Sequence, residues 1–503
     1  MLLSLKDIDL SKLSEFFPVD FEKLKEWFSY STTKPWFFTE FSFLGVFGVF
    51  LIIYSVLAKA NTLRKVYIIV FSLFFYYKSS GPFLGLFVLM ILSAYLFALA
   101  IHKSNGWLKK LLLWLSVSYS LSFLLYFKYA NFFIENFNAF LHTNFELQNL
   151  FLPIGISFYT FQSVSYIVDV YRKEIPPSRN FTDYAFYMTF FPHLVAGPIV
   201  RAKDFLPQIV SPEIITSKLF KESMLRIITG LLKKLFLADY LAKYVDLVHM
   251  SPSGFSGAEN LLSMYAYAFQ IYFDFSGYSD IAIGIALLLG YRLKENFQNP
   301  YTAVNITEFW RKWHISLSNW LRDYVYIPLG GNRKGLINTY LFLLITMLIG
   351  GFWHGADWRF VFWGLAHGLA LILHKIWKHF FPKEARKWFV RIPLILITFH
   401  FVGFCWIFFR ATSFSNAFIS IQQIFLNTQP RDFIGFWFSR PEISSVLTIA
   451  FAILVIPVKV KEYLFSKIQL LPAITWIIWI IIALQIIVQF KDDVVQPFIY
   501  FQF

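Results

Sequence analysis

The amino-acid sequence predicts an all-α fold, a polytopic bundle of about 10–13 membrane-spanning helices with re-entrant and interfacial helices among them. Of its 503 residues, 57% are hydrophobic and only 15% are charged, which exceeds the apolar content of one soluble core. Charged residues gather in short clusters between apolar runs of roughly 17 to 25 residues, the length that crosses about 30 Å of hydrocarbon as a helix. No repeat or flexible linker interrupts the chain, so one continuous helical domain is the simplest organisation.

The basic residues are spread along the chain rather than gathered in one patch. The formal net charge is +15, and Lys and Arg recur at 59–65, 103–110, 218–234 and 375–391. This distribution is typical of loops beside anionic lipid, so we expect contact with membrane lipid and no binding of nucleic acid. Cys405 is the only cysteine, which excludes an intrachain disulfide. No grouping of His, Asp and Glu has the spacing of a zinc site, so we predict no metal.

Composition divides the chain into three parts. Residues 1–35 carry mixed charge and are expected to form an N-terminal interfacial segment, without a cleavable signal peptide because Asp7 and Glu15 interrupt any apolar stretch. Residues 36–490 form the transmembrane domain, with the first anchor beginning near Trp36, and residues 491–503 form an aromatic tail. Spanning or buried helices are predicted at about 36–58, 66–77, 81–101, 107–127, 149–170, 181–199, 219–247, 258–290, 336–352, 358–380, 392–410, 443–458 and 472–490.

Two of the predicted helices contain helix-breaking residues. Pro153 and Gly155 lie in the segment at 149–170, and Pro192 and Pro198 lie in the segment at 181–199. Irregular backbone at membrane depth is tolerated only where protein or water satisfies its polar groups. We therefore expect broken helices that are packed inside the bundle.

The segment at 305–324 is predicted to be one amphipathic interfacial helix rather than a span. At about 100° per residue, its aromatic and leucine side chains share one arc of the helix, whereas the polar residues Asn319, Arg322 and Asp323 lie outside that arc. His314 falls at the edge of the arc. Two interpretations are open for it: a histidine that snorkels to the interface, or one that faces the protein interior.

His354 is the first catalytic candidate. It follows a long apolar run and lies in the string Gly-Gly-Phe-Trp-His-Gly at 350–355, whose glycines allow sharp changes of backbone direction. An ionisable side chain at membrane depth is costly and counts as a functional-site hypothesis. Imidazole, with a pKa of about 6.5, is also the side chain best suited to accept a proton near neutral pH. The alternative is a histidine that is hydrogen-bonded within a helix hairpin.

Two carboxylates interrupt another apolar helix. Asp274 and Asp280 lie in a mostly apolar stretch, where they must be paired, hydrated or protonated. They either bond across helices or line a substrate tunnel. The small residues Ser276, Gly277 and Gly284 nearby permit close helix contact.

The last six residues are strongly aromatic. The string Phe-Ile-Tyr-Phe-Gln-Phe at 498–503 would promote aggregation if it were exposed to solvent. We therefore expect this tail to fold back into the bundle and bring the Tyr500 hydroxyl inside. From composition alone, the simpler role is a plug of aromatic side chains.

Several of these strings together resemble the membrane-bound O-acyltransferase family, and within it the membrane subunits of alginate and peptidoglycan O-acetyltransferases. They are Leu-Pro-Ile-Gly-Ile-Ser-Phe-Tyr at 152–159, Ala-Gly-Pro at 196–198, Tyr-Phe-Asp-Phe-Ser-Gly-Tyr-Ser-Asp at 272–280, the long string at 308–332, and Gly-Phe-Trp-His-Gly at 351–355. The resemblance runs from about residue 120 to 410 and is weaker outside that range.

The resemblance implies a helical bundle around a central tunnel in the bacterial inner (cytoplasmic) membrane. An acyl donor such as acetyl-coenzyme A would enter from the cytosol, with no permanently bound cofactor. The acceptor would be an extracytoplasmic polysaccharide such as peptidoglycan, alginate or another cell-envelope glycan. A periplasmic or extracytoplasmic partner, resembling an acetyltransferase or esterase, would complete the transfer.

The resemblance also implies roles for individual residues. His354 matches the family's catalytic histidine, and His314 matches a second conserved position. Phe498, Tyr500 and Phe503 are similar to a Phe-x-Tyr-x-x-Phe motif that ends the small protein accompanying the teichoic-acid D-alanyl transfer member, whose tyrosine is thought to carry the acyl group. We therefore predict His354, His314 and Tyr500 as catalytic residues. Contacts with substrate are predicted for Trp313, Asn319, Arg322, Asp323, Trp353 and Asp274.

Two alternatives to polysaccharide acylation remain open. A lipid or protein O-acyltransferase would have the same fold and the same histidines. A polytopic transporter would also use broken helices and intramembrane carboxylates, but it gives no reason for the terminal tyrosine motif.

Overall fold

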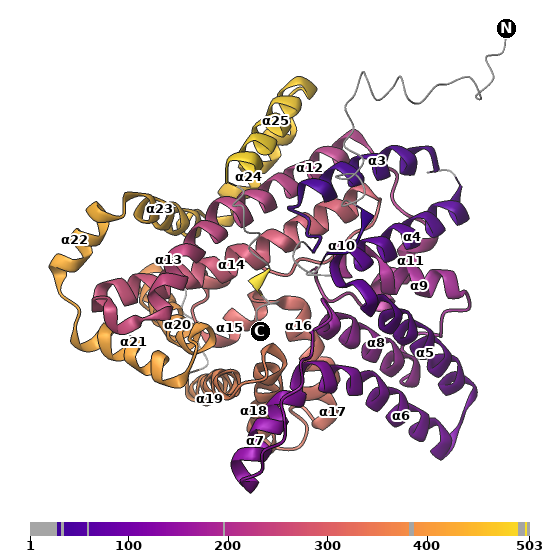
Figure 1. The fold of residues 1–503 in the computed structure, drawn as a ribbon, viewed down its shortest axis with the longest axis horizontal. Helices are drawn as coiled ribbons and strands as arrows, with labels where there is room; N and C mark the ends of the chain where they lie inside the picture. The colour runs from indigo at the N-terminus through magenta and orange to yellow at the C-terminus, as the bar shows by residue number, and fades with distance from the viewer. Residues whose placement is uncertain are drawn as a thin grey trace.

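The computed structural model describes residues 28–31, 35–57, 60–194, 197–381, 387–490 and 498–499. Among these residues helices are the only regular elements, as Figure 1 shows, so the predicted all-α fold is confirmed. In chain order the α-helices are α3 (Phe41–Leu57), α4 (Asn61–Ser80), α5 (Leu84–Lys103), α6 (Gly106–Leu124), α7 (Ala130–Leu141), α8 (Ile156–Tyr171), α9 (Phe181–Thr189), α10 (Phe191–Leu194), α11 (Ala202–Val210), α12 (Ser217–Leu231), α13 (Asp239–Met250), α14 (Gly257–Leu288), α15 (Ile306–Lys312), α16 (Ile315–Leu321), α17 (Ile327–Leu329), α18 (Leu336–His354), α19 (Trp358–Phe380), α20 (Trp388–Arg410), α21 (Phe414–Leu426), α22 (Pro430–Ser439), α23 (Pro441–Val455), α24 (Val458–Gln469) and α25 (Ala473–Phe490). Three π-helical turns, η2 (Leu125–Tyr129), η3 (Leu232–Ala238) and η6 (Arg322–Tyr326), and three 3₁₀ turns, η1 (Gly81–Phe83), η4 (Pro252–Gly254) and η5 (Pro300–Thr302), connect them.

The chain is a multi-pass membrane protein with fewer candidate spans than the sequence suggested. By length and composition, six stretches of the described residues can cross a membrane, or up to eight if each of two bent helix pairs is one span. The prediction of about 10–13 treated every apolar run as a span. Two predicted runs join in one helical stretch, Asn61–Lys103, while α8 has only 16 residues and the apolar run at 219–247 is divided among α12, η3 and α13.

The long helix α14 is the centre of the bundle. It has 32 residues, and 94% of its most apolar window is buried. Its start is fixed by a capping box, in which Ser256 and Glu259 bond reciprocally to the first turn. It packs against α12, α13, α20 and α21, and Figure 1 shows it running through the middle of the molecule.

The crossing of α12 and α14 depends on two facing glycines. A Cβ atom at Gly277 would lie 2.8 Å from the carbonyl oxygen of Gly230, and one at Gly230 would lie 2.5 Å from that of Gly277. Further along the crossing, a Cβ at Gly284 would lie 2.6 Å from the side chain of Ile227. The prediction that small residues allow close helix contact is therefore confirmed at Gly277 and Gly284.

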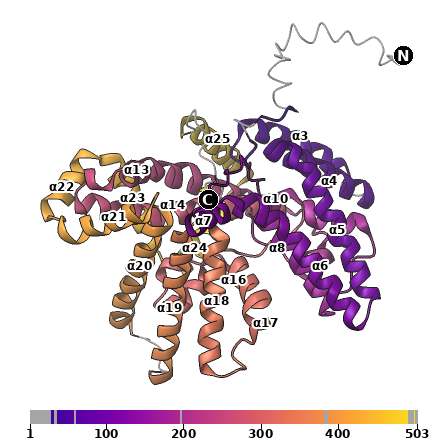
Figure 2. The ribbon, with the colours of Figure 1, turned by 60° about the horizontal axis from the view of Figure 1, so that its bottom comes forward.

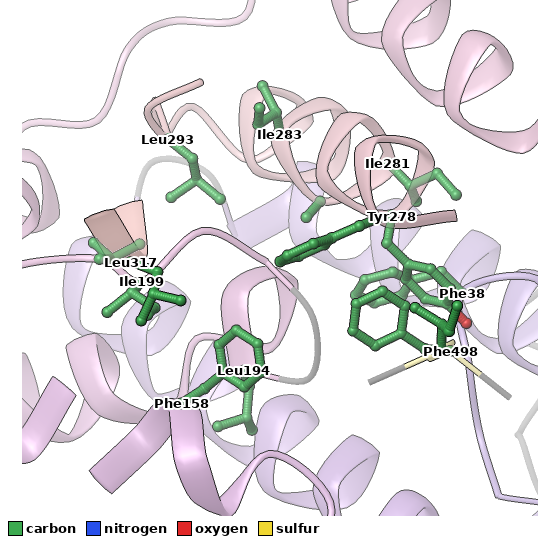
Figure 3. Packing of buried hydrophobic residues seen from close by; sticks show 14 of the residues in the cluster. Phe38, Phe158, Leu194, Ile199, Tyr278, Ile281, Ile283, Leu293, Leu317 and Phe498 are labelled. Atoms are coloured by element: carbon green, nitrogen blue, oxygen red, sulfur yellow. The ribbon is translucent and has the colours of Figure 1, made fainter. Parts of the chain in front are cut away.

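The N-terminal helices form a second group beside this centre. Helices α5 and α6 pack on α8, and α4 packs on α9, so this group is built from α3 to α6 with α8 and α9 (Figure 1). Figure 2, which is rotated by 60° from the view of Figure 1, shows the hairpin of α18 and α19 with α20 extending away from the other helices on one side. Aromatic rings join the two groups: Phe38 and Tyr278, 6.2 Å apart, lie next to Phe498 in Figure 3.

Both segments that were predicted to be broken are broken. α8 begins only at Ile156, after Gly155, whose φ of +76° and close approach to the Leu194 carbonyl require a glycine. The segment at 181–199 divides into α9 and the single turn α10. The expected interfacial segment lies largely outside the described residues, and the first described long helix, α3, begins at Phe41 rather than near Trp36.

Candidate active site

The prediction of one continuous helix at 305–324 is wrong. The chain forms α15 and α16, each of seven residues, and breaks between them at Trp313 and His314. His314 has φ +42° and ψ 56°, a left-handed conformation that non-glycine residues adopt only when their surroundings enforce it. Both residues are fully buried. The interior position of His314 is therefore the correct alternative, and the segment consists of two short helices instead of one.

Asn296 enforces the break and orients His314. Its backbone carbonyl accepts a hydrogen bond from the amide of Ile315 at 2.9 Å. Its side-chain oxygen accepts from the amide and hydroxyl of Ser316, at 3.2 and 2.9 Å, and lies 3.2 Å from Nδ1 of His314. An oxygen that accepts these bonds requires a donor at Nδ1, which leaves the lone pair of the imidazole on Nε2.

Burial keeps the His314 imidazole neutral. The residue lies between two short helices, outside the candidate spans, and desolvation lowers its pKa from the ordinary 6.5 to about 3. A neutral ring with its lone pair on Nε2 can accept a hydrogen bond at that atom.

His354 is the last residue of α18 and is 2% exposed. Its ring lies 5.0 Å from that of Trp363 and 5.1 Å from that of Phe409, both in edge-to-face contacts. The glycines beside it serve close packing rather than unusual backbone angles. A Cβ at Gly351 would overlap the Phe360 carbonyl, and one at Gly355 would overlap the Phe360 ring, while neither glycine has a positive φ.

Trp353 lies between the two histidines. Its ring centroid is 5.0 Å from that of His354 and 6.0 Å from that of His314. On its other side it contacts Phe158 and Phe161 of α8, at 5.6 and 5.5 Å. The structure therefore brings three predicted site residues together around one indole ring, which is 4% exposed.

The C-terminal tail reaches the same place. Phe498 is fully buried and Ile499 is 2% exposed, so these two residues lie inside the protein. The Phe498 ring lies 4.8 Å from that of Tyr278 and 5.2 Å from that of Phe275 (Figure 3). Phe275 in turn lies 4.5 Å from the ring of His314. Tyr500 lies outside the described residues.

Asp274 fixes the tail to α14. One of its carboxylate oxygens accepts the backbone N–H of Ile499 at 2.7 Å, and the other lies 2.7 Å from Nζ of Lys234. Lys234, 2% exposed in its side chain, also pairs with Asp239 at 2.7 Å. The second carboxylate of the helix, Asp280, pairs with Lys233 and Arg226 at 2.6 and 3.0 Å. Of the two interpretations of these carboxylates, bonding across helices describes the contacts observed.

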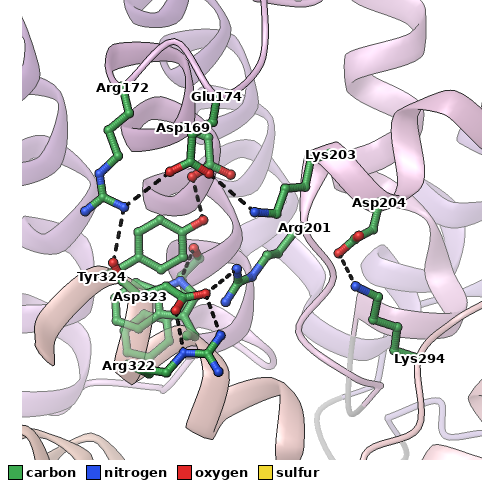
Figure 4. Close-up of polar contacts among 12 residues, drawn as sticks. Asp169, Arg172, Glu174, Arg201, Lys203, Asp204, Lys294, Arg322, Asp323 and Tyr324 are labelled. Carbon is green, nitrogen blue, oxygen red and sulfur yellow. Dashed lines mark hydrogen bonds and ion pairs between the residues drawn. The ribbon is translucent and has the colours of Figure 1, made fainter. Parts of the chain in front are cut away.

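Arg322 and Asp323 lie in a separate cluster of ion pairs, drawn in Figure 4. Asp323 bonds to Arg322 and to Arg201, each at 2.6 Å. The adjacent Tyr324 hydroxyl donates to Asp169 at 2.7 Å. Burial alone would raise the pKa of Asp323, but the two guanidinium groups outweigh burial and hold it below its ordinary value.

The structure thus does not gather the predicted substrate contacts in one place. Trp353 lies between the histidines, and Trp313 lies in the aromatic core beside Trp406, 5.1 Å away. Asp274 holds the tail, Arg322 and Asp323 form the ion-pair cluster, and Asn319 is half-buried on α16. No group of three or more His, Cys, Asp or Glu that could hold a metal occurs in the described part of the chain.

Two residues that contact this site were not predicted. Asn296 gave no signal, because a single Asn in a loop has no distinguishing pattern. Lys128 did offer one: it is a lone cation at the end of an apolar run, and its ammonium bonds to the carbonyl oxygen of His354 at 2.9 Å. Intramembrane cations are costly enough to be examined individually.

The chain resembles known proteins over most of its length. The sequence model of the membrane-bound O-acyltransferase family matches residues 71–416. A peptidoglycan O-acetyltransferase of Helicobacter pylori is 38% identical over 76% of this chain and 77% of the relative. A probable alginate O-acetylase AlgI of Pseudomonas aeruginosa is 41% identical over 72% of this chain and 70% of the relative. A teichoic acid D-alanyltransferase of Bacillus subtilis is 30% identical over 53% of this chain and 71% of the relative.

Proposed function

Because the chain belongs to the membrane-bound O-acyltransferase family and is an acyltransferase, we propose that it transfers acyl groups across a membrane to a polysaccharide. The donor is a cytosolic thioester, in the simplest case acetyl-coenzyme A, which acts as a substrate and not as a resident cofactor. The acceptor is a hydroxyl group of an extracytoplasmic cell-envelope glycan. The names of the relatives, which include peptidoglycan, alginate and teichoic acid transferases, support this acceptor class.

In the proposed reaction His354 is the general base. Its neutral imidazole takes the proton of an attacking hydroxyl while that oxygen bonds to the carbonyl carbon of the thioester. The carbon–sulfur bond then breaks, and the proton on His354 passes to the leaving thiolate. His314, held by Asn296 with its lone pair on Nε2, orients the donor by accepting a hydrogen bond at that atom.

The attacking hydroxyl of the first step is proposed to be that of Tyr500. A free phenol has a pKa near 10, so it needs a base to react near neutral pH. The resulting acyl-tyrosine passes its acyl group to a second hydroxyl, either of the glycan or of a partner protein. That second step releases the tyrosine and returns the enzyme to its starting state.

The observation that carries this proposal is the contact of one ring, Phe275, with both Phe498 and His314. Tyr500 follows Ile499 directly in the sequence, and the backbone N–H of Ile499 is bonded to Asp274 of α14. Phe498 and His314 therefore pack on the same side chain of α14. A transporter needs no such meeting of a C-terminal segment with a buried histidine.

The proposed membrane location and partner protein follow from the same chemistry. The donor requires access to the cytosol and the glycan lies outside, so we place the enzyme in the bacterial cytoplasmic membrane. A partner on the outer side, with a nucleophilic hydroxyl of its own, would accept the acyl group and deliver it to the polysaccharide.

The test uses the full chain, purified in detergent and incubated with isotope-labelled acetyl-coenzyme A in the absence of an acceptor. We expect release of the coenzyme A thiol and an acetyl adduct on Tyr500 in the C-terminal peptide, read by mass spectrometry. The variant Tyr500→Phe keeps the ring and should show no adduct.

Two results would count against the proposal in different ways. If no acyl-coenzyme A thioester is cleaved, the donor class is wrong. If thiol release proceeds equally in Tyr500→Phe and no adduct forms, the acyl group passes directly to its acceptor and Tyr500 is not a carrier.

A further inference from the structure

The last three carbonyl groups of α18 are bonded by two neighbouring residues of another helix. The hydroxyl of Tyr129 donates to the carbonyl oxygen of Phe352 at 2.8 Å. The ammonium of Lys128 donates to the carbonyl oxygens of Trp353 and His354, at 2.8 and 2.9 Å. The peptide groups on both sides of the His354 side chain are therefore tied to one region of the chain.

Lys128 and Tyr129 reach α18 from the π-helical turn η2, between α6 and α7. Such single π turns are rare and are frequent at functional sites. The carbonyls at the end of a helix have no partner within the helix, and a cation there also interacts favourably with the helix dipole. Lys128 supplies both the hydrogen-bond donor and the charge.

The position of this cation is costly. Lys128 lies in the candidate span Gly106–Leu141, where an ammonium must be satisfied by polar groups. In the part of the chain that the structure describes, its hydrogen bonds go to the two carbonyls and it forms no ion pair with a carboxylate. It also lies 5.9 Å above the ring centroid of Trp353, within the range of a cation–π contact.

The same ammonium can be reached from a cavity. Lys128 lines a cavity of about 300 Å³ together with Ser79 and the stretch at 151–158. Among the described residues that line it, Lys128 is the only cation. Phe158 forms part of this wall and contacts Trp353, so the cavity is linked to the histidines through these two side chains.

We propose that Lys128 is a positioning residue for the acyl transfer. By holding the peptide groups of Trp353 and His354, its charge fixes the direction of the His354 ring and the place of the indole between the two histidines. Lys128 does not touch the reacting atoms. This inference rests on the proposed function for its kinetic consequence, but the geometry that it assigns to Lys128 can be tested without catalysis.

The experiment replaces the charge and then restores it chemically. Lys128→Cys is made in a Cys405→Ala background, so that position 128 carries the only thiol of the chain. Treatment with 2-bromoethylamine converts that cysteine into a close analogue of lysine, whereas methyl methanethiosulfonate leaves it uncharged. The cavity beside Lys128 gives both reagents a path to the thiol. Lys110→Ala, an exposed lysine on α6, is the matched control.

We expect the untreated Lys128→Cys protein to lose on the order of 10- to 100-fold in kcat for thioester cleavage, with the donor KM changed by less than about twofold, because a misdirected base loses rate rather than binding. Aminoethylation should restore kcat to within about threefold of the Cys405→Ala background. The methylthiolated protein should stay slow, and Lys110→Ala should match wild type. Unchanged kcat in Lys128→Cys, or loss without recovery after aminoethylation, overturns the inference.

A second readout separates this inference from the proposed function. The rate at which diethyl pyrocarbonate modifies His354, followed by peptide mass spectrometry, reports how tightly the end of α18 is held. We expect faster modification in Lys128→Cys and the original rate after aminoethylation. If wild type cleaves no thioester but this rate still follows the charge at position 128, the proposed function fails and the positioning role stands. Equal rates in all forms overturn the positioning role.

Discussion

Helices α14 and α18 both carry ionisable groups in apolar surroundings, but they hold them in opposite ways. On α14, Asp274 and Asp280 contact the ammonium groups of Lys234 and Lys233 at 2.7 and 2.6 Å. On α18, the His354 ring lies about 5 Å from the rings of Trp353, Trp363 and Phe409. Each of these carboxylates links α14 to the segment that carries its cation, whereas an imidazole is the kind of side chain that serves as a general base. Buried charge pairs therefore serve the architecture here, and the ring-enclosed histidine is the candidate for chemistry.

The largest effect is expected from His354→Ala on α18, and it is an effect on turnover. Loss of a general base typically lowers turnover on the order of 10² to 10⁴-fold, and the cavity left by the ring lies at a helix end, where the fold can tolerate it. Thioester cleavage by purified protein measures the activity, and thermal unfolding in detergent measures the fold. The control is His249→Gln, another buried histidine, on α13. Activity near wild type in His354→Ala would remove this histidine from the reaction.

On α14, by contrast, we expect substitutions to lower the stability of the fold. Lys234→Met leaves the buried Asp274 and the partly exposed Asp239 without their shared cation, and breaking such a buried pair costs about 3–5 kcal/mol of unfolding free energy. We expect a lower midpoint of thermal unfolding and weaker protection of the tail from carboxypeptidase, since Asp274 also holds Ile499. The double variant Lys234→Met with Asp274→Asn should recover part of the stability. Full stability of the single variant would show that the pair is not structural.

A smaller and mixed effect is expected from Asn296→Ala. The change removes the oxygen that accepts hydrogen bonds from Nδ1 of His314 and from the amide and hydroxyl of Ser316. Donors that stay buried without an acceptor lower the free energy of unfolding by about 1–3 kcal/mol. We also expect turnover to fall on the order of tenfold, because the His314 ring loses its fixed tautomer. Asn260→Ala, another buried asparagine, should lose stability without this loss of turnover. Equal activity in the two variants would contradict the orienting role of Asn296.

The smallest effect is expected in the ion-pair cluster of Figure 4. Asp323→Asn should cost about 1 kcal/mol of unfolding free energy near neutral pH, because solvent screens a half-exposed pair. The pKa of Asp323 is depressed in the folded state, so its contribution is complete above the ordinary value of 3.8 and is lost as the pH falls through the folded pKa. The stability difference between wild type and variant should therefore shrink below about pH 3.8. A difference that stays constant across that range would exclude the ion pairs as its cause.

The type of fold could be predicted from the sequence because it depends on local signals; the same kind of signal singled out His354, whose catalytic role stays a prediction. Apolar runs of spanning length identify membrane helices, and an imidazole inside such a run at His354 is conspicuous. The number of spans was overestimated, since hydropathy does not distinguish a helix that crosses lipid from a short one buried by protein, such as α8. The three parts of the chain, 1–35, 36–490 and 491–503, remain a prediction.

The surroundings of His314 could not be predicted from local pattern. At about 100° per residue, the spacing at 305–324 is that of a continuous amphipathic helix. The break arises from Asn296, which lies 20 residues before Ser316 in the sequence and bonds to Ile315 and Ser316. A tertiary hydrogen bond of this kind overrides helix propensity. The roles of His314, Tyr500 and the other predicted site residues stay predictions until the variants are measured.

The close approach of the Gly230 and Gly277 backbones has a consequence for motion. Two helices whose main chains meet resist rocking or sliding past one another, because a shift would overlap atoms or open a void. We therefore expect α12 and α14 to move as one unit when other parts of the bundle rearrange.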